Sequence, residues 1–427
     1  MGMSSTTLHA RLEGAQPAWK YVDQVLVRPQ SDANRIVGPA PAPGKDVTQA
    51  LQAVGNPTEE RWPSGEWVYA RNPWSLCAFE GKIFLGSGNS NNPPPAANAG
   101  PVDLWALDPR TGKFAREFEV PDEQVDVMRV LSDGLWIPGH DSKVIARDDQ
   151  RVKGESKLQH LARLIKTAVG FPSDWALGNA HHKDGAKWET HRSIPNGIHV
   201  YDLIEFGGDL FAAVATVAGG MVARSKDRGR TWKEMLTKPF PFSRTRTFFL
   251  LDDDQGPRLY ASTNGGRIYR FQGDDFAEMK VRFFPGLTDL KEVFAARPTS
   301  FRSQVAFIGA RKIIDHDWAP LGLFAAAQPD AARALPLPEG ALPRDLLVHD
   351  DALYALASTQ PSPRSTRVHV FATRDLESFE EVCSFEAETF ARSFEMLGGD
   401  FYFGMGCDPE LLQRQTGQIL KLPASAL

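Results

Sequence analysis

The sequence has little cysteine, little net charge and no long hydrophobic run, and each shortage excludes a class of protein. Its three cysteines, Cys77, Cys383 and Cys407, are too few and odd in number for a disulfide framework. We therefore expect a reducing, cytoplasmic location. Export stays open as an alternative if the opening residues MGMSS stand in place of a natural export signal.

Membrane insertion and nucleic-acid binding are also not expected. No apolar run reaches the roughly 18–20 residues that span a bilayer, and the first twenty residues have no signal-peptide core. A net charge of −5 over 427 residues argues against a nucleic-acid binder held by bulk electrostatics. Because no phosphate-binding glycine loop, dinucleotide fingerprint, zinc pattern or Gly-x-Ser-x-Gly elbow occurs, we predict no cofactor.

What the chain does contain is turn-forming residues and a repeat. Its 36 glycines and 31 prolines favour a β-rich protein over a helical bundle. An apolar strand, a tight polar turn and a second apolar strand recur along the chain. The first apolar residue after each turn falls at Ile83, Leu135, Leu210, Leu259, Val305, Leu353 and Phe401.

This spacing is about 48 residues, with one insertion of about 25, which is typical of four-stranded sheets arranged radially. We therefore predict an all-β fold, a seven-bladed β-propeller with four-stranded antiparallel blades. Six or eight blades are the alternatives, because the fifth copy is loose. Residues 1–14 are predicted to be a flexible N-terminus and 15–427 a single propeller domain.

Three segments fall outside the repeat. The seventh copy ends one strand short, and Trp19–Val22 resembles the fourth strand of the third copy, so we predict a closing strand within 15–30. Residues 36–65 are rich in proline and glycine and are predicted to wrap the outside. Residues 145–174 carry leucines at helical spacing, which predicts a helical insertion in blade 2 that packs on the propeller, forms a lid or docks a partner.

Residues 225–232 spell S-x-D-x-G-x-T-W, with Ser225, Asp227, Gly229, Thr231 and Trp232 at the specified positions. This string resembles the Asp-box, or BNR repeat, of sialidase-like β-propellers, and weaker relatives occupy the same turn in other copies. The resemblance implies a propeller fold. It also implies a structural role for this turn, on the face opposite the active site of the family.

Aligning the copies on their turns gives one apolar column and, two residues earlier, one polar column. The apolar column is Leu76, Met128, Leu203, Phe248, Val293, Leu346 and Phe394. The polar column is Trp74, Asp126, Tyr201, Arg246, Lys291, Arg344 and Arg392. Since equivalent positions of a propeller meet around its channel, we expect the polar column to surround one channel mouth.

Two interpretations of the cations in this column stay open. In one, the adjacent carboxylates Asp202, Glu292 and Asp345 neutralise them locally. In the other, Arg246, Lys291, Arg344 and Arg392 bind an anion, and Trp74 and Tyr201 stack against a sugar or another ring. Long loops at 87–103, 140–174, 310–320, 359–367 and 405–417 would share this face, where binding sites usually lie.

Other chemistry is less well supported by the sequence. His140 and Asp141 are weak candidates for metal ligands, without a diagnostic spacing. Asp126, Asp202 and His199 are candidate catalytic residues near the mouth. We predict a binding or scaffold propeller that recognises an anionic or glycan-like ligand or a protein partner. A glycoside hydrolase or lyase, and an accessory subunit of a larger complex, are the alternatives.

Overall fold

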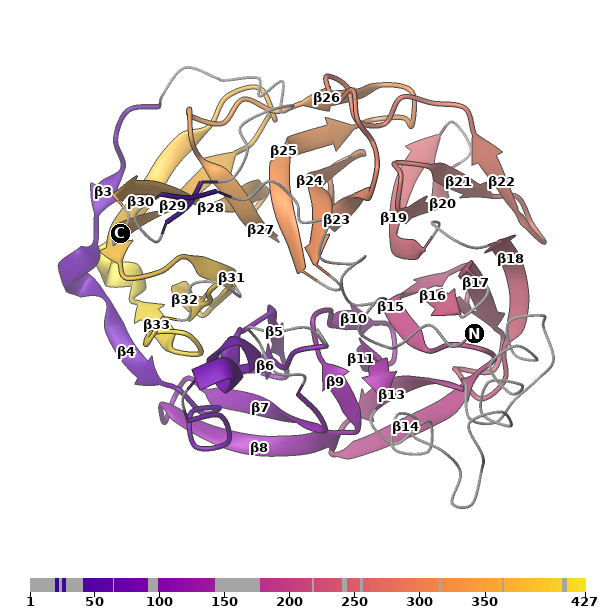
Figure 1. The fold of residues 1–427 in the computed structure, drawn as a ribbon, viewed down its shortest axis with the longest axis horizontal. Helices are drawn as coiled ribbons and strands as arrows, with labels where there is room; N and C mark the ends of the chain where they lie inside the picture. Colours follow the sequence, from indigo (N-terminus) through magenta and orange to yellow (C-terminus); the bar gives the residue numbers. More distant parts are fainter. Residues whose placement is uncertain are drawn as a thin grey trace, which may run out of the picture.

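A computed structural model describes residues 20–22, 25–27, 41–63, 65–90, 99–142, 177–216, 219–239, 244–253, 256–314, 317–362, 365–408 and 413–427. Seven antiparallel blades form a ring with one inner strand of each blade toward the centre (Figure 1). The predicted seven-bladed propeller is therefore confirmed. The predicted helical insertion at 145–174 lies outside the described residues.

Each blade follows the strand–turn–strand repeat of the sequence. Blade 1 contains β5 (Ser75–Phe79), β6 (Lys82–Gly86), β7 (Val102–Asp108) and β8 (Lys113–Val120). Blade 2 contains β10 (Arg129–Leu131), β11 (Gly134–Pro138), β13 (Gly178–Asp184) and β14 (Lys187–Ile194). Blade 3 contains β15 (His199–Phe206), β16 (Asp209–Thr216), β17 (Gly219–Ser225) and β18 (Lys233–Pro239).

The second half of the ring repeats the same order. Blade 4 contains β19 (Thr245–Asp253), β20 (Gly256–Thr263), β21 (Ile268–Phe271) and β22 (Phe276–Met279). Blade 5 contains β23 (Val293–Phe301), β24 (Gln304–Ile314), β25 (Asp317–Ala326) and β26 (Ala332–Ala334). Blade 6 contains β27 (Leu342–His349), β28 (Ala352–Ser362), β29 (Ser365–Thr373) and β30 (Glu380–Ala387). The segments predicted as long loops at 310–320 and 359–367 are largely strand, in extended hairpins of blades 5 and 6.

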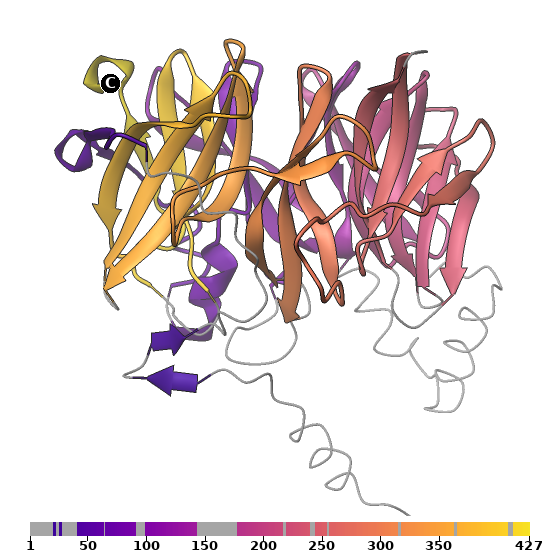
Figure 2. The same ribbon diagram turned by 90° about the horizontal axis from the view of Figure 1, so that it is seen from above.

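Blade 7 is completed from the other end of the chain. Its sheet contains β31 (Ala391–Leu397), β32 (Asp400–Met405) and β33 (Ile419–Leu422), and β33 pairs with β4 (Gln52–Gly55) as the outer strand. Closure by an N-terminal strand is thus confirmed, but its predicted position within 15–30 is wrong. There, β1 (Lys20–Val22) pairs with β2 (Val25–Val27) as a separate hairpin on one face of the ring (Figure 2).

The likeness of Trp19–Val22 to an outer strand was misleading because an outer strand needs few apolar residues. β4 contributes Val54 to the packing between blades 7 and 1, and its backbone supplies the remaining pairing. β4 lies within residues 36–65, the segment whose composition predicts a linker that wraps the outside. Part of that segment is thus the closing strand of blade 7.

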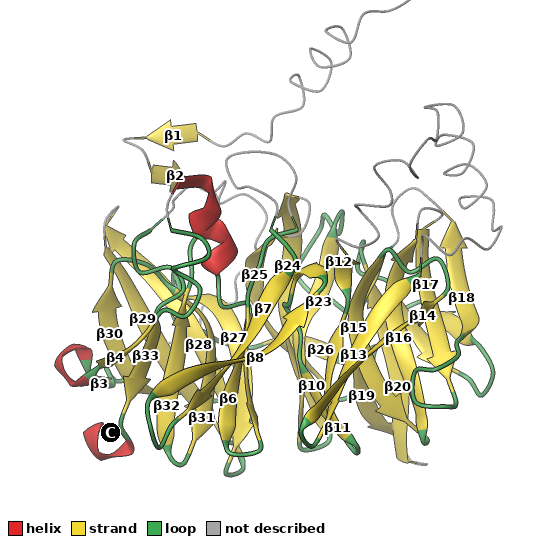
Figure 3. Cartoon of the chain, turned by 90° about the horizontal axis from the view of Figure 1, so that it is seen from below, coloured by secondary structure: helices red, strands yellow, loops and turns green. Residues whose placement is uncertain are grey.

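Two short strands extend the sheet of blade 3 beyond its inner strand β15. β12 (His140–Ser142) pairs with the inner strand β15 of blade 3, and β9 (Asp122–Gln124) pairs with β12. The 3-10 helix η3 (Gly65–Arg71) leads into β5 and lies on the same side of the ring as the β1–β2 hairpin (Figure 3). No helix among the described residues is long and apolar enough to cross a membrane.

The predicted apolar column is buried in every blade, with Met128 the most exposed at 9%. One residue before that column, side chains connect neighbouring blades. The Asp202 carboxylate accepts the Phe248 N–H (2.9 Å), and the Thr247 hydroxyl donates to the Ala295 carbonyl oxygen (2.8 Å). Hydrogen bonds from equivalent positions of successive inner strands to the backbone of the next blade therefore hold the blades together.

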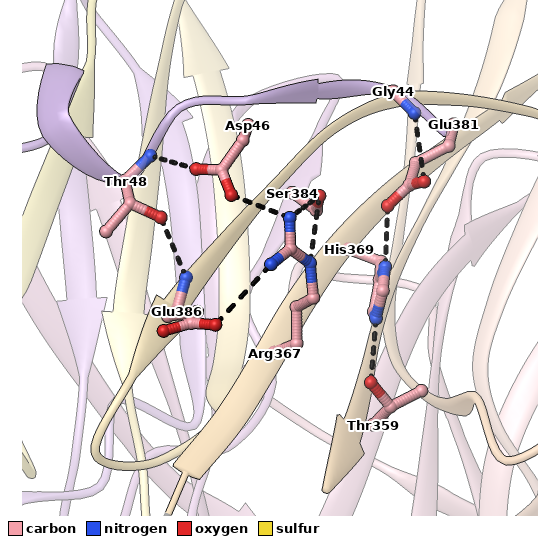
Figure 4. A network of polar contacts seen from close by, with 9 residues as sticks. All are labelled: Gly44, Asp46, Thr48, Thr359, Arg367, His369, Glu381, Ser384 and Glu386. Carbon is pink, nitrogen blue, oxygen red and sulfur yellow. Dashed lines mark hydrogen bonds and ion pairs between the residues drawn. The ribbon is translucent and has the colours of Figure 1, made fainter. Parts of the chain in front are cut away.

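The N-terminal segment is attached before it reaches blade 7. β3 (Lys45–Asp46) pairs in parallel with β30 at the outer edge of blade 6, and two polar networks hold it there (Figure 4). Glu381 accepts from the Gly44 N–H (3.0 Å) and contacts His369 Nδ1 (2.6 Å). Arg367 donates to Asp46 (2.8 Å) and to Ser384 (2.9 Å).

We predict that Gly44→Ala detaches this segment. A Cβ at Gly44 would lie 2.3 Å from the Glu381 carbonyl oxygen, so β3 must shift away from β30. The free energy of unfolding should fall by about 1–3 kcal/mol, the usual range for overpacking. Chemical denaturation and amide exchange at Val47 measure this. Lys45→Ala, at an exposed neighbour, is the control; unchanged Val47 exchange in Gly44→Ala would contradict the prediction.

Candidate functional site

The inner strands enclose a cavity of about 230 Å³ in the central channel, lined by residues of all seven blades. Four members of the polar column line it: Trp74, Asp126, Tyr201 and Arg246. Arg344 and Arg392 are buried but are not among the lining residues. Lys291 is exposed in the segment before β23. The column therefore converges in part.

β-Bulges place most of these side chains. In blades 3, 4, 6 and 7 the pairing of the inner two strands skips one residue, which is Tyr201, Arg246, Arg344 or Arg392. A bulged residue is freed from the alternation of a regular strand and its side chain is redirected. In these four blades, the polar column therefore corresponds to a β-bulge that recurs near the start of the inner strand.

Arg246 carries a positive charge into the cavity. Its residue exposure is 7%, and its Nε donates to Asn264 Oδ1 (2.9 Å). Burial lowers the pKa of Arg246, although Tyr201 and Asp126 partly oppose this. Within the described part of the chain, no carboxylate lies within ion-pair distance of Arg246. A buried guanidinium without a direct ion pair attracts an anion.

The two aromatic residues of the column are already occupied. The Arg246 guanidinium lies 4.2 Å from the Tyr201 ring centre, and His199 stacks on the same ring at 5.7 Å. The Arg392 guanidinium lies 4.2 Å from the Trp74 ring centre. These rings therefore hold arginines in place by cation–π contact, and the predicted stacking of a sugar against them has no support in this geometry.

Arg344 and Arg392 belong to a stack beside the cavity. Both guanidinium groups face the Phe390 ring, at 3.7 and 5.1 Å from its centre. Arg344 also donates to Ser358 Oγ (3.1 Å), and Arg392 donates to Asn72 Oδ1 (2.8 Å). Their donors serve the protein itself, so we assign them a structural role.

Asp126 contributes a negative charge to the same cavity. Its Oδ1 lies 3.5 Å from His140 Nδ1, and its side chain is 23% exposed. Burial by itself would raise the pKa of Asp126, but His140, Arg297 and Arg246 outweigh it and the pKa is lowered. Burial, reinforced by His140 and Arg244, lowers the pKa of His199 well below its usual range, so His199 is neutral at neutral pH.

The carboxylates expected to neutralise the column have other partners. Asp202 makes a two-point ion pair with Arg129, at 2.9 and 2.7 Å, and accepts two backbone N–H groups. Glu292 accepts from Asn264 (2.6 Å), and Asp345 pairs with Arg297 (3.4 Å). None of the three carboxylates forms an ion pair with Arg246 among the described residues, but Glu292 is joined to Arg246 through Asn264 and raises the pKa of Arg246. Asp202, with every oxygen engaged, is structural.

Sequence reasoning missed Arg297. It lies at φ 52° in a bulge of β23 and reaches across the channel, where its guanidinium donates to the carbonyl oxygens of Asp126 (2.9 Å) and Trp74. The alignment placed the blade 5 turn at Arg297, whereas the hairpin turns at Arg302–Ser303. The Arg-Pro pair inside a strand was the available signal, because proline there marks a bulge.

The turn at 225–232 joins β17 and β18, as predicted. Ser225 Oγ accepts the Gly229 N–H (2.8 Å) and donates to Asp227, while Asp227 accepts the N–H (2.8 Å) and hydroxyl (2.6 Å) of Thr231. These Thr231 contacts lower the pKa of Asp227 to about 2. Trp232 packs at the edge of the core between blades 2 and 3. The turn is thus built from its own side chains, and its role is structural.

No group of three or more histidine, cysteine or acidic residues suited to a metal occurs in the described ranges. His140 is buried against Asp126, and the side chain of Asp141 lies outside the description. Cys77, Cys383 and Cys407 are free thiols.

No protein-family model matches the sequence, and no curated protein is significantly similar to it. The WD40 domain of Pan2 from Neurospora crassa superposes with a TM-score of 0.51 at 9% identity, over 90% of this chain and 98% of that domain. A GH74 xyloglucanase from Xanthomonas campestris gives 0.48 at 11% identity, over 83% of this chain and 52% of the enzyme. YCF48 from Cyanidioschyzon merolae gives 0.42 at 10% identity, over 88% and 100%. At such identities the WD40 likeness shows the propeller fold alone.

Proposed function

We propose that this protein is a binding propeller whose ligand is a small anionic molecule, held in the central channel by Arg246. The observation that carries the proposal is the buried Arg246 guanidinium, which lines the cavity and whose direct contacts among the described residues are an amide oxygen and aromatic rings. A charge removed from water without a counter-charge is unfavourable, and a bound anion relieves that penalty.

The size of the cavity limits the ligand. At about 230 Å³ it is smaller than the ~300–1,000 Å³ pockets that hold drug-sized molecules. Its walls include Phe294, Trp318 and Met128, so part of the ligand meets apolar surface. A single carboxylate- or phosphate-bearing unit of the size of a monosaccharide or an amino acid fits these limits.

We also infer that the 225–232 turn is an Asp-box of a sialidase-like propeller. Its support is the shared hydrogen-bond pattern of two turns. In the turn that follows β29, Asp375 accepts the N–H (2.9 Å) and hydroxyl (3.0 Å) of Ser378, as Asp227 does from Thr231. This likeness concerns the scaffold, since both turns lie outside the cavity lining.

Glycoside hydrolysis has less support than binding. It usually needs two carboxyl groups that flank the bond. In the cavity, Asp202, Asp345 and Glu395 each accept backbone N–H groups that link strands. Asp126 is the one cavity carboxylate for which no such contact occurs in the described part of the chain, so a working pair is not formed.

Titration calorimetry with Arg246→Gln tests the proposal. The probes are sialic acid, glucuronate, glucose 6-phosphate, a sulfated galactose and simple carboxylic and amino acids. The wild type should bind at least one anion, and the variant should bind it about 10–100-fold more weakly, since hydrogen bonds to charged groups contribute ~1.5–3 kcal/mol.

Lys291→Gln is the matched control, because it removes one exposed cation of the same predicted column. It should bind like the wild type. Arg246→Lys keeps the positive charge and should retain more of the anion affinity than Arg246→Gln does. That difference would separate loss of the charge from a folding defect. Equal affinity of wild type and Arg246→Gln, or no binding of any probe, would rule out the proposed function.

A further inference from the structure

The cavity wall carries a second charge, that of Asp126, which, like Arg246, has no oppositely charged arginine, lysine or carboxylate within ion-pair distance among the described residues. The Asp126 carboxylate lines the wall, and its one contact at ion-pair distance in the described part of the chain is with His140 Nδ1, at 3.5 Å. Its Oδ1 is buried without a hydrogen bond inside the described ranges. Arg297, which passes close by, donates to the Asp126 main-chain carbonyl oxygen, so its Nη1 serves the backbone there.

Asp126 and Arg246 face the same cavity and form no direct ion pair in the described chain. The other charged lining residues are mostly matched: Arg129 with Asp202, and Arg297 with Asp345. Glu395 accepts two backbone N–H groups, and Lys312 has further contacts of its own. Two opposite charges thus remain apart on the wall of one small space.

Two separated charges of opposite sign in one small cavity are stabilised most by a single ligand that carries a complementary charge for each of them. A ligand with only an anionic group would satisfy Arg246 and leave the Asp126 carboxylate with only its 3.5 Å contact to His140 among the described residues. A ligand with a negative and a positive end satisfies both, by charge-assisted hydrogen bonds at each end.

We propose that the ligand is a short zwitterion of α-amino-acid size, with its carboxylate at Arg246 and its ammonium group at Asp126. This inference rests on the proposed function and specifies the chemical class of its ligand. Phe294 and Trp318 would face the apolar part between the charged ends or beyond them. The cavity of about 230 Å³ accommodates one such molecule.

The test compares matched molecules that differ in one charged end. The probes are the twenty standard L-amino acids and γ-aminobutyrate, and, for each that binds, the carboxylic acid that lacks the amino group and the amine that lacks the carboxylate. Calorimetry with the wild-type full chain should show at least a 10-fold preference for the zwitterion over both partial molecules.

The variant Asp126→Asn should remove the preference for the amino group. A hydrogen bond to a charged group contributes ~1.5–3 kcal/mol, which is enough to account for a preference of 10-fold or more. Without the carboxylate, the amino acid and its des-amino counterpart should bind within about 3-fold of each other. Asp108→Asn, at the last residue of β7 and outside the cavity lining, is the control and should leave the preference intact.

The outcomes separate the two proposals. Equal binding of amino acids and their des-amino counterparts by the wild type would overturn the zwitterion and leave the anion site standing. Failure of every carboxylate to bind would overturn both. Because the comparison among probes uses the wild type, a folding defect in Asp126→Asn does not prevent a decision.

Discussion

Replacing Asp202 by asparagine is expected to lower the free energy of unfolding by about 3–5 kcal/mol, the range measured when one partner of a buried ion pair is removed. The Asp202 side chain is fully buried, and the Arg129 side chain is 26% exposed. Asp202 also accepts the Leu203 and Phe248 N–H groups, so it connects blades 3 and 4 as well. The asparagine amide would place N–H donors against these donors.

Denaturant unfolding measures the loss, and two variants make it specific. Arg129→Met combined with Asp202→Asn removes the unpaired arginine, so the double variant should be less destabilised than the sum of the single variants by about 0.5–3 kcal/mol. Arg110→Gln breaks the exposed pair with Asp108 and should change stability by no more than about 0.5 kcal/mol. A stability of Asp202→Asn equal to that of Arg110→Gln would refute the assignment.

Replacing Arg297 by alanine is expected to have an effect of similar size, about 3–5 kcal/mol. Its guanidinium bonds two carbonyl oxygens of blades 1 and 2 and pairs with Asp345 of blade 6. The two carbonyl contacts reach across the channel from blade 5, whereas Asp345 lies in the neighbouring blade 6. Arg297→Gly should be less damaging than Arg297→Ala by about 0.5–1 kcal/mol, because φ 52° suits glycine.

The pH dependence of the Arg297 variants gives an independent check. Burial raises the pKa of Asp345, and Arg297 opposes that rise. Without Arg297 the folded-state pKa of Asp345 rises further above its unfolded value, so folding takes up a proton. Stability lost at neutral pH should therefore return as the pH falls through the folded pKa toward about 4. A deficit of equal size at pH 7 and pH 4.5 would contradict the pairing.

The sequence by itself determined the scaffold. Strand pairs at a fixed spacing predict blades, and the buried positions Leu203, Phe248 and Phe394 recur at the same place in each blade because the pleat alternates between faces. Closure by an N-terminal strand followed from the missing strand of the last repeat. The alignment also identified Arg246 and Asp126, the two charges that carry both functional proposals.

Only the tertiary structure decided which charges meet. A bulge adds a residue without changing the apolar pattern around it, so the alignment counted Lys291 as the blade 5 member and overlooked Arg297. Ion pairs between blades and hydrogen bonds across the channel join residues that are far apart in the sequence, and their partners depend on the bend of each strand. The sequence therefore names the charged residues at the mouth, whereas the three-dimensional packing determines that Arg246 alone among the predicted cations faces the cavity.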